Sequence, residues 1–204
     1  MSGALAGRRI GLLTAWASRQ NGGVFEAVVA QVAMLRQLGA EVAVFSLDSA
    51  HTAEDAPRLA GAALHAFPVT GPGQIGYAPG LVPALLAADL DCLHLHGIWM
   101  YPSRAGAVWA RRTGRPYLIS PHGMLDPWIT ARGRWKKALA RFGYERMGWR
   151  AAHAFHALTA REAEDIARES GRSDSLVIPN AGPAALPVPT APRGPEMLYI
   201  GRIH

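Results

Sequence analysis

Segments with the pattern of β-strands alternate with segments with the pattern of α-helices along most of this chain, and this alternation restricts the folds available to it. The predicted strands cover residues 9–16, 41–47, 62–69, 91–95, 116–120, 154–158 and 176–178. The predicted helices cover residues 24–38, 81–88, 103–113, 133–149 and 160–170. Strands that alternate with helices form a parallel sheet covered on both faces. We therefore predict an α/β, Rossmann-like fold with helices on both faces of a parallel sheet.

Short signals mark the ends of several predicted helices. Gly39, Gly114 and Gly171 each come directly after a segment with helical periodicity, and glycine is a common C-terminal stop. Thr159 lies three residues before Glu162, which is the spacing of a capping box at a helix amino end. These signals support the predicted boundaries.

The end of the chain differs in composition from the rest. Residues 1–180 have the length of one domain. Residues 181–195 contain five prolines, which remove backbone donors and favour extended chain, so we predict a linker there. Residues 196–204 include the strand formers Tyr199 and Ile200. We predict that they are the first strand of a carboxyl-terminal domain that continues beyond this sequence.

Composition excludes several classes of protein. The chain has 204 residues, of which 50% are hydrophobic, so it can bury a sizeable core. No apolar run is long enough to span a bilayer, and the apolar run after Arg9 lacks a cleavage site, so we predict no signal peptide. The single cysteine, Cys92, lies in an apolar strand and is interpreted as a core residue. The cytoplasm is the expected compartment.

The excess positive charge is concentrated in one segment. Residues 131–150 hold seven Lys or Arg and one Glu, a net charge of +6 that equals that of the whole chain. One interpretation is a solvated basic face on a helix whose apolar stripe anchors it in the core. The other is contact with an anionic membrane or a phosphorylated acceptor through Lys136, Lys137 and Arg141. No motif indicates nucleic acid binding. The apolar stripe comprises Trp135, Ala138, Leu139, Phe142 and Trp149.

The loop between the first strand and the first helix is a candidate ligand site. Ligands of parallel α/β sheets bind at the carboxyl ends of the strands. Gly22 and Gly23 lie in this loop, and glycines there let the backbone approach a ligand while the helix amino terminus favours an anion. The simpler interpretation is a flexible turn. A second glycine motif, at residues 71–76, matches G-x-G-x-x-G but follows no first strand, so we interpret it as a surface loop.

Two histidines followed by glycine stand at the ends of neighbouring strands. Strand alternation places His94 and His96 on one face of the sheet, but no carboxylate or cysteine completes a metal site. We predict that His96 contacts a ligand and that His94 packs internally. His122, followed by Gly123, is the leading candidate, since an imidazole there can donate to a sugar hydroxyl or a phosphate.

Several motifs in the second half of the chain belong together. They are Ser-Pro-His-Gly-Met-Leu-Asp-Pro-Trp at 120–128, Arg-Trp-Lys-Lys at 134–137, His-Ala-Leu-Thr at 156–159 with Glu162, Val-Ile-Pro-Asn at 177–180 and Leu-Tyr-Ile-Gly-Arg-Ile at 198–203. The first four resemble the amino-terminal half of family-4 glycosyltransferases. The last is similar to the first strand of their carboxyl-terminal half. Residues 180–183, Asn-Ala-Gly-Pro, depart from the usual Asn-Gly followed by an apolar residue and an acid.

This resemblance implies a fold and a site. Enzymes of that family have the GT-B fold, in which two Rossmann-like domains enclose the active site, so this chain is implied to be the amino-terminal half. They transfer a sugar from a nucleotide sugar with retention and without a metal, which implies that no cofactor is needed. Gly22 and Gly23 are implied to border the donor phosphates, His122 to contact the transferred sugar, and Arg202 to belong to the diphosphate clamp. The matching lysine and carboxylate motif are expected beyond residue 204.

The expected function is therefore that of an acceptor-side domain of a bacterial-type glycosyltransferase. Its expected partners are a nucleotide sugar, a saccharide or lipid-linked acceptor of the cell envelope or exopolysaccharide, and an anionic membrane surface. The competing class is a non-catalytic Rossmann-like binding domain, and a nicotinamide enzyme is a third possibility. The sequence does not specify the sugar or the acceptor.

Overall fold

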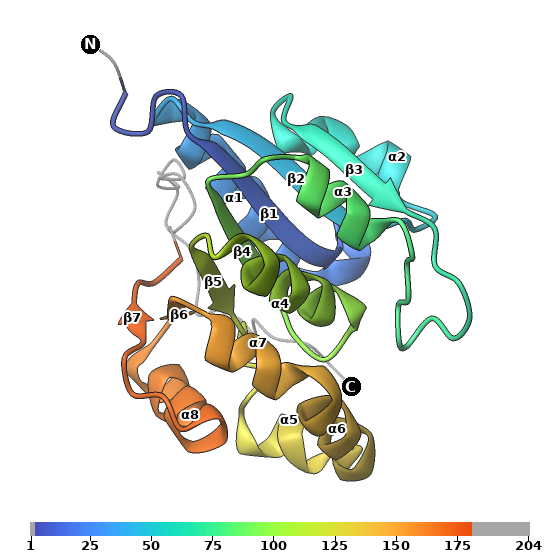
Figure 1. Cartoon of the computed structure of the whole chain (residues 1–204), viewed down its shortest axis with the longest axis vertical. Coiled ribbons are helices and arrows are strands. Elements are labelled where there is room, and N and C mark those ends of the chain that lie inside the picture. Colours follow the sequence, from blue (N-terminus) through green and yellow to red (C-terminus); the bar gives the residue numbers. More distant parts are fainter. Residues whose placement is uncertain (1–2, 181–204) are drawn as a thin grey trace, which may run out of the picture.

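A seven-stranded, fully parallel sheet forms the centre of the molecule (Figure 1). The computed structural model describes residues 3–180. Its strands are β1 (Arg9–Trp16), β2 (Glu41–Leu47), β3 (Ala63–Phe67), β4 (Cys92–His96), β5 (Tyr117–Ser120), β6 (Ala154–Ala157) and β7 (Leu176–Val177). The strand order is β3-β2-β1-β4-β5-β6-β7. The order reverses at β1, so the switch point of the sheet lies between β1 and β4.

Helices connect the strands in sequence order. The helices are α1 (Gly23–Gln37), α2 (Thr52–Asp55), α3 (Leu81–Ala87), α4 (Tyr101–Thr113), α5 (Pro127–Ala131), α6 (Arg134–Ala140), α7 (Arg146–Ala151) and α8 (Ala160–Ser170). Two short 3-10 turns cover Arg19–Asn21 and Ala56–Leu59, and a π-helical segment covers Arg141–Glu145. The first of these 3-10 turns lies directly before α1 and shapes the predicted ligand loop.

Two apolar layers, one on each face of the sheet, confirm the predicted architecture. Successive residues of β1 point to opposite faces, so Leu12 packs with α1 and Leu13 with α3 and α4. Figure 1 shows α3, α4 and α7 in front of the sheet and α1 behind it. Both layers are buried, and large aromatic residues such as Trp109 of α4 and Phe25 of α1 fill them. The core therefore holds the strands in place, and loops extend from their carboxyl ends.

The predicted helix over residues 133–149 is confirmed as one helical stretch over 134–151, formed by α6, the π-helical segment and α7. The short helix α5 before it and the π-helical turn within it were not predicted. We call residues 127–151, which include α5, the basic arm. Gly133 adopts a left-handed conformation (φ 63°) and starts α6 afresh. Arg146 N–H bonds to Arg141 O, five residues back, so the π-helical turn shifts the helical register.

This shift divides the predicted apolar stripe. Trp149 is 3% exposed and packs in the core. Trp135, Leu139 and Phe142 are 66%, 65% and 72% exposed. The interpretation of the stripe as a set of core anchors therefore holds for Trp149 and is wrong for the other three large residues. These three side chains instead form an exposed apolar surface on the basic arm.

Two further expectations can be compared with the structure. Residues 71–76 form a loop with left-handed Gly71 and Gly76; residues 71–75 are exposed, as predicted, whereas Gly76 is buried against Leu47 and Met100. Cys92 is only partly buried, and this burial raises the pKa of its thiol to about 11, so the thiol is protonated near neutral pH. The predicted linker (181–195), the predicted strand (196–204) and Arg202 lie outside the described residues and stay predictions.

Candidate functional site

The structure brings together the two strand-tip histidines that the sequence singled out. His96 ends β4, and His122 lies two residues after the end of β5. The two rings stack with centroids 5.2 Å apart, and His96 Nδ1 lies 3.0 Å from His122 Nε2. His122 and Gly123 both have positive φ, 54° and 74°. A left-handed histidine is uncommon and carries strain, and strain of this kind clusters at functional sites.

Behind this pair, a chain of hydrogen bonds crosses the sheet from α1 to the end of β7. His94 Nδ1 lies 2.9 Å from Gln31 Nε2, and His94 Nε2 lies 2.7 Å from Ser120 Oγ. Ser120 Oγ in turn lies 2.7 Å from His156 Nδ1, and His156 Nε2 lies 2.7 Å from Ile178 O. His94 therefore bonds internally, as predicted.

The hydrogen bond to Ile178 O, the last in this series, fixes the donor and acceptor of every other bond in it. Ile178 O can only accept, so His156 Nε2 must donate. In neutral His156 the other ring nitrogen, Nδ1, then accepts from the Ser120 hydroxyl, which leaves the serine oxygen to accept from His94 Nε2. His94 Nδ1 accepts from the Gln31 amide. The tautomers of His156 and His94 therefore both follow from the single acceptor Ile178 O.

Burial keeps the histidines nearest the site neutral. Desolvation lowers the pKa of His94 to about 3 and that of His122 to about 4, with smaller contributions from the neighbouring imidazoles. Desolvation also lowers the pKa of His96 well below its ordinary value. At neutral pH these rings therefore act as hydrogen-bonding groups and carry no charge. Because His122 Nε2 faces His96, its Nδ1 is the nitrogen left for a ligand.

The predicted capping box does more than cap a helix. Thr159 Oγ1 accepts from Glu162 N–H, 3.1 Å away, as the motif predicts. The Glu162 carboxylate accepts from Leu158 N–H and, across the loop, from Gly123 N–H, both at 2.7 Å. Glu162 therefore holds the turn that carries His122.

The glycine loop after β1 is held from three sides. Asn21 Nδ2 donates to Thr14 Oγ1 (2.8 Å) and to Trp16 O (3.0 Å). Gly22 has φ 55° and ψ −132°, a conformation open to glycine and strained for other residues. Gly23 is the first residue of the 15-residue helix α1, and no side chain caps that helix amino end. Gly22 N–H bonds Arg19 O, so the loop presents the backbone N–H groups of Gly23 and Val24 at the switch point of the sheet.

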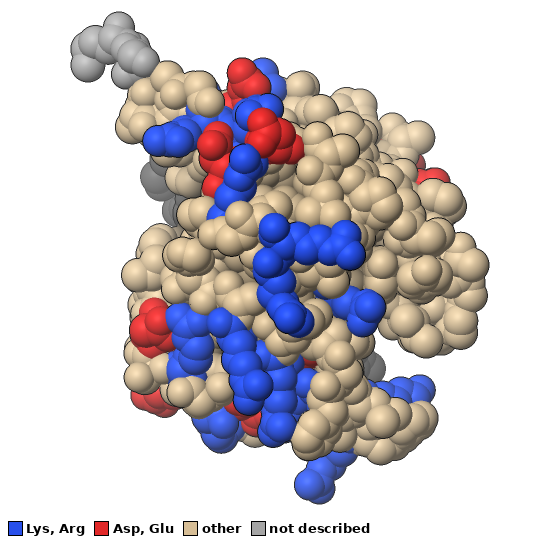
Figure 2. Space-filling model, in the orientation of Figure 1, with Lys and Arg blue, Asp and Glu red and all other residues tan. Residues whose placement is uncertain are grey.

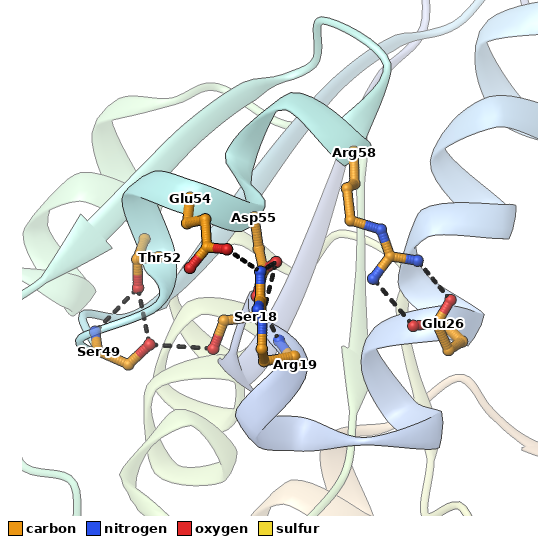
Figure 3. A network of polar contacts seen from close by, with 8 residues as sticks. All are labelled: Ser18, Arg19, Glu26, Ser49, Thr52, Glu54, Asp55 and Arg58. Atoms are coloured by element: carbon orange, nitrogen blue, oxygen red, sulfur yellow. Dashed lines mark hydrogen bonds and ion pairs between the residues drawn. The ribbon is translucent and has the colours of Figure 1, made fainter.

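An ion-paired network fixes the start of this loop (Figure 3). The buried Asp55 carboxylate accepts from Arg19 N–H and from the Arg19 guanidinium at 2.7–3.0 Å. Glu54 pairs with the same guanidinium at 2.7 Å, and Ser18 bonds to Ser49 at 3.0 Å. The Arg19 hydrogen bonds lower the pKa of Asp55 to about 2. The short helix α2 therefore anchors the loop.

A cavity of about 290 Å³ opens beside His122. Its walls come from α1, from the carboxyl ends of β4 to β6 and from the segment after β7. The polar side chains that face it are Gln31, His96, His122, His156 and Asn180. The cavity thus joins the histidine cluster to the residues that lead out of the domain.

The three basic residues predicted to contact a membrane or acceptor differ in their surroundings. Lys136 is exposed, with its ammonium 5.5 Å from the Trp135 ring centre. Lys137 donates to Ile129 O and Arg132 O, and Arg141 pairs with Glu169. Two of the three are therefore engaged within the chain, although no observation tests their role.

The sequence did not predict the roles of three further polar residues, although two of them stand in the motifs at 120–128 and 156–159. Asp55, Ser120 and His156 each act through a partner far away in sequence. The local signal that could have identified them is a polar residue within an apolar strand or a short turn. Within residues 3–180, no group of three or more His, Cys, Asp or Glu side chains has the geometry of a metal site.

Residues 22–181 match the glycosyl transferase 4-like domain family, so the chain belongs to that family. No curated protein sequence matches the chain.

Solved structures share the fold. HepE of Anabaena, solved with UDP and glucose, aligns with a TM-score of 0.64 at 17% identity over 86% of this chain and 45% of its own. MurG of Acinetobacter baumannii gives 0.55 at 15% identity over 87% and 46%. The UDP-GlcNAc 2-epimerase of Neisseria meningitidis, bound to UDP-GlcNAc, gives 0.54 at 13% identity over 83% and 45%. The chain spans less than half of each, and its fold is that of a GT-B amino-terminal domain.

Proposed function

We propose that this chain is the acceptor-side domain of a retaining glycosyltransferase that uses a nucleotide-sugar donor and needs no metal. The observation that carries the proposal is the juxtaposition at the switch point of the sheet. There the amino end of α1 at Gly22 and Gly23, which follows β1, and the strained, neutral His122, which follows β5, lie at the carboxyl edge of the sheet on either side of β4. Both features suit a ligand with a diphosphate and a sugar.

Each element has a distinct chemical task in this proposal. The N–H group of Gly23 faces the donor diphosphate, because a helix amino end attracts anions. Gly22 borders the diphosphate through its backbone conformation, since its own N–H bonds Arg19 O. His122 Nδ1 bonds a hydroxyl of the transferred sugar, and His96 orients the His122 ring through the contact between His96 Nδ1 and His122 Nε2. The bond from the sugar to the diphosphate breaks with its electron pair on the leaving oxygen, while the acceptor hydroxyl bonds to the same carbon and gives its proton to the departing diphosphate.

The basic arm is the proposed contact for a lipid-linked acceptor or an anionic membrane. Trp135, Leu139 and Phe142 are exposed beside Lys136 and Arg146, a combination that suits the interface of a bilayer. Figure 2 shows Lys and Arg gathered on the lower part of the molecule, over the arm. No helix within residues 3–180 could span a membrane. We propose a peripheral enzyme at the inner face of the plasma membrane that builds an envelope or exopolysaccharide.

The test is a sugar-transfer assay on the complete enzyme and on residues 1–204 alone. We expect enzyme-dependent transfer from a UDP-sugar by the complete enzyme and none by the chain alone, because half of the site is then missing. Transfer by the chain alone would contradict this division of labour. No transfer by the complete enzyme with any nucleotide sugar, together with unaltered ligand binding, would favour the alternative, a non-catalytic binding domain.

A further inference from the structure

The π-helical turn of the basic arm places two consecutive side chains on one backbone unit of the β4–α4 loop. Glu145 Oε1 accepts from Trp99 N–H at 2.6 Å, and Tyr144 Oη donates to Trp99 O at 2.9 Å. The Glu145 side chain is buried although it is an acid. Both polar groups of the Trp99 backbone are therefore held by the arm.

Trp99 has a conformation that needs such support. Its φ of 78° lies in the left-handed region, which is sterically unfavourable for a bulky aromatic residue. Residues kept in this region persist when their surroundings over-determine them. π-Helical turns also concentrate at functional sites. A strained loop residue, a π-helical turn and a buried acid thus meet at one point.

Trp99 connects this point to the loop that carries His122. Its indole Nε1 donates to Met124 O at 3.1 Å. Ile98 N–H points to Met124 Sδ at 3.3 Å, and Met124 N–H closes the turn on Pro121 O at 3.2 Å. The turn between Pro121 and Met124 contains His122 and Gly123. Movement at Trp99 therefore acts on both strand-tip loops.

We infer that Glu145 and Tyr144 are positioning residues that hold His122 against His96 by clamping the backbone of Trp99. This inference rests on the proposed function, because it assigns the two residues to the alignment of a sugar-binding histidine. The basic arm then has two roles. Its exposed side offers an apolar and basic surface, and its buried side holds the loop of the site through Trp99.

The surroundings of Glu145 support this role. Burial raises the pKa of Glu145 to about 7, partly opposed by the Trp99 hydrogen bond. The Ser103 hydroxyl and the Trp149 indole N–H also approach this carboxylate, although neither makes a hydrogen bond of normal geometry. The carboxylate has few partners besides Trp99. A glutamine at this position keeps the acceptor for Trp99 N–H, whereas an alanine removes it.

The experiment compares Glu145→Ala, Glu145→Gln and Tyr144→Phe in the complete enzyme, with Asp89→Asn as the matched control. Asp89 pairs with Arg115 before β4, at the amino edge of the sheet, away from the histidines. We expect Glu145→Ala and Tyr144→Phe to lower kcat about tenfold or more with little change in donor KM. Glu145→Gln should stay within about threefold of the wild type, since it keeps the acceptor.

A second measurement does not depend on activity. In protein labelled with [13C]histidine, the pKa of His122 should rise from about 4 towards its ordinary value in Glu145→Ala, because a loosened loop admits water. Normal kcat and an unchanged His122 pKa in folded Glu145→Ala and Tyr144→Phe would overturn the inference. If the wild type transfers no sugar, the proposed function fails, and the His122 titration alone decides whether the clamp exists.

Discussion

The strand-tip loops and the basic arm are neighbours built on opposite principles. The loops are short, enter and leave a buried sheet, and are held by hydrogen bonds to neighbouring elements, such as His96 to His122 and Glu162 to Gly123. The arm is long, interrupted at Gly133, and leaves Trp135 and Phe142 in solvent. A site that must align atoms is enclosed by its scaffold, whereas a surface that meets a soft or variable partner can stay open. The clamp at Trp99 is the point where the two meet.

The largest expected effect concerns the enclosed region. Replacing His122 with alanine in the complete enzyme should lower kcat by a factor on the order of 10² or more, because a hydrogen bond made where charge develops is lost. His153→Ala is the control, since His153 is exposed and precedes β6 at the other edge of the sheet. A near-normal kcat for a folded His122→Ala enzyme would show that the histidine is structural.

The second prediction uses acid to compare buried and exposed histidines. His94 and His122 have folded-state pKa values of about 3 and about 4, below the ordinary 6.5. The unfolded chain therefore binds more protons between pH 6.5 and 4, so the stability present above pH 6.5 is lost as the pH falls through this window. Each such histidine should cost about 1.4 kcal/mol per pH unit.

Thermal unfolding between pH 7 and 4.5 measures this slope. His94→Gln should flatten it by the contribution of one proton, and His153→Gln, which replaces an exposed histidine, is the control. Identical slopes for wild type and His94→Gln would mean that His94 titrates normally and that the cluster is more hydrated than the structure shows.

The third prediction concerns the hydrogen-bond chain beneath the site. Ser120→Ala should lower the free energy of unfolding by about 2 kcal/mol, because it leaves the buried His94 Nε2–H and the His156 Nδ1 atom without partners. Ser175→Ala is the control, since Ser175 Oγ has no hydrogen-bond partner among the described residues. Chemical denaturation gives both values, and equal stabilities would refute the directed chain.

The sheet with its strand-tip loops and the basic arm also differ in how much of their structure the sequence predicted. Apolar runs located every strand of the sheet to within a few residues. The central strands lie in a core that demands an apolar pattern, and the edge strands β3 and β7 keep apolar residues although they are partly or fully exposed. In the arm the same pattern located the helical stretch over 134–151 but missed the π-helical turn within it, which changes the register of the side chains. Periodicity assumes one helix geometry, and it cannot detect an inserted turn.

The site shows the same division. His96, His122 and the glycine loop were found from local signals at strand ends. The second bond of Glu162, to Gly123, and the grip of Glu145 on Trp99 join residues 39 and 46 positions apart. Such partners are set by the packing of α7 and α8 on the sheet, which a single sequence does not display.

The smallest expected effect tests the openness of the arm. Lys136 and Arg146 are exposed, whereas Lys137 and Arg141 are bonded within the chain. On acidic vesicles, Lys136→Gln with Arg146→Gln should weaken binding up to about tenfold, since each cation near an anionic leaflet contributes roughly 1 kcal/mol or less in salt. Lys137→Gln with Arg141→Gln should weaken it less and mainly lower stability.

Fluorescence separates insertion from electrostatic adhesion in the same samples. A blue shift on acidic vesicles that disappears in Trp135→Phe would place that indole in the interface, because Trp135 is the most exposed tryptophan of the described residues. Binding that disappears on adding salt without any shift would indicate adhesion by charge alone. Equal retention of wild type and both double variants on acidic and neutral vesicles would remove the membrane from the proposal and leave the arm as a solvated basic surface.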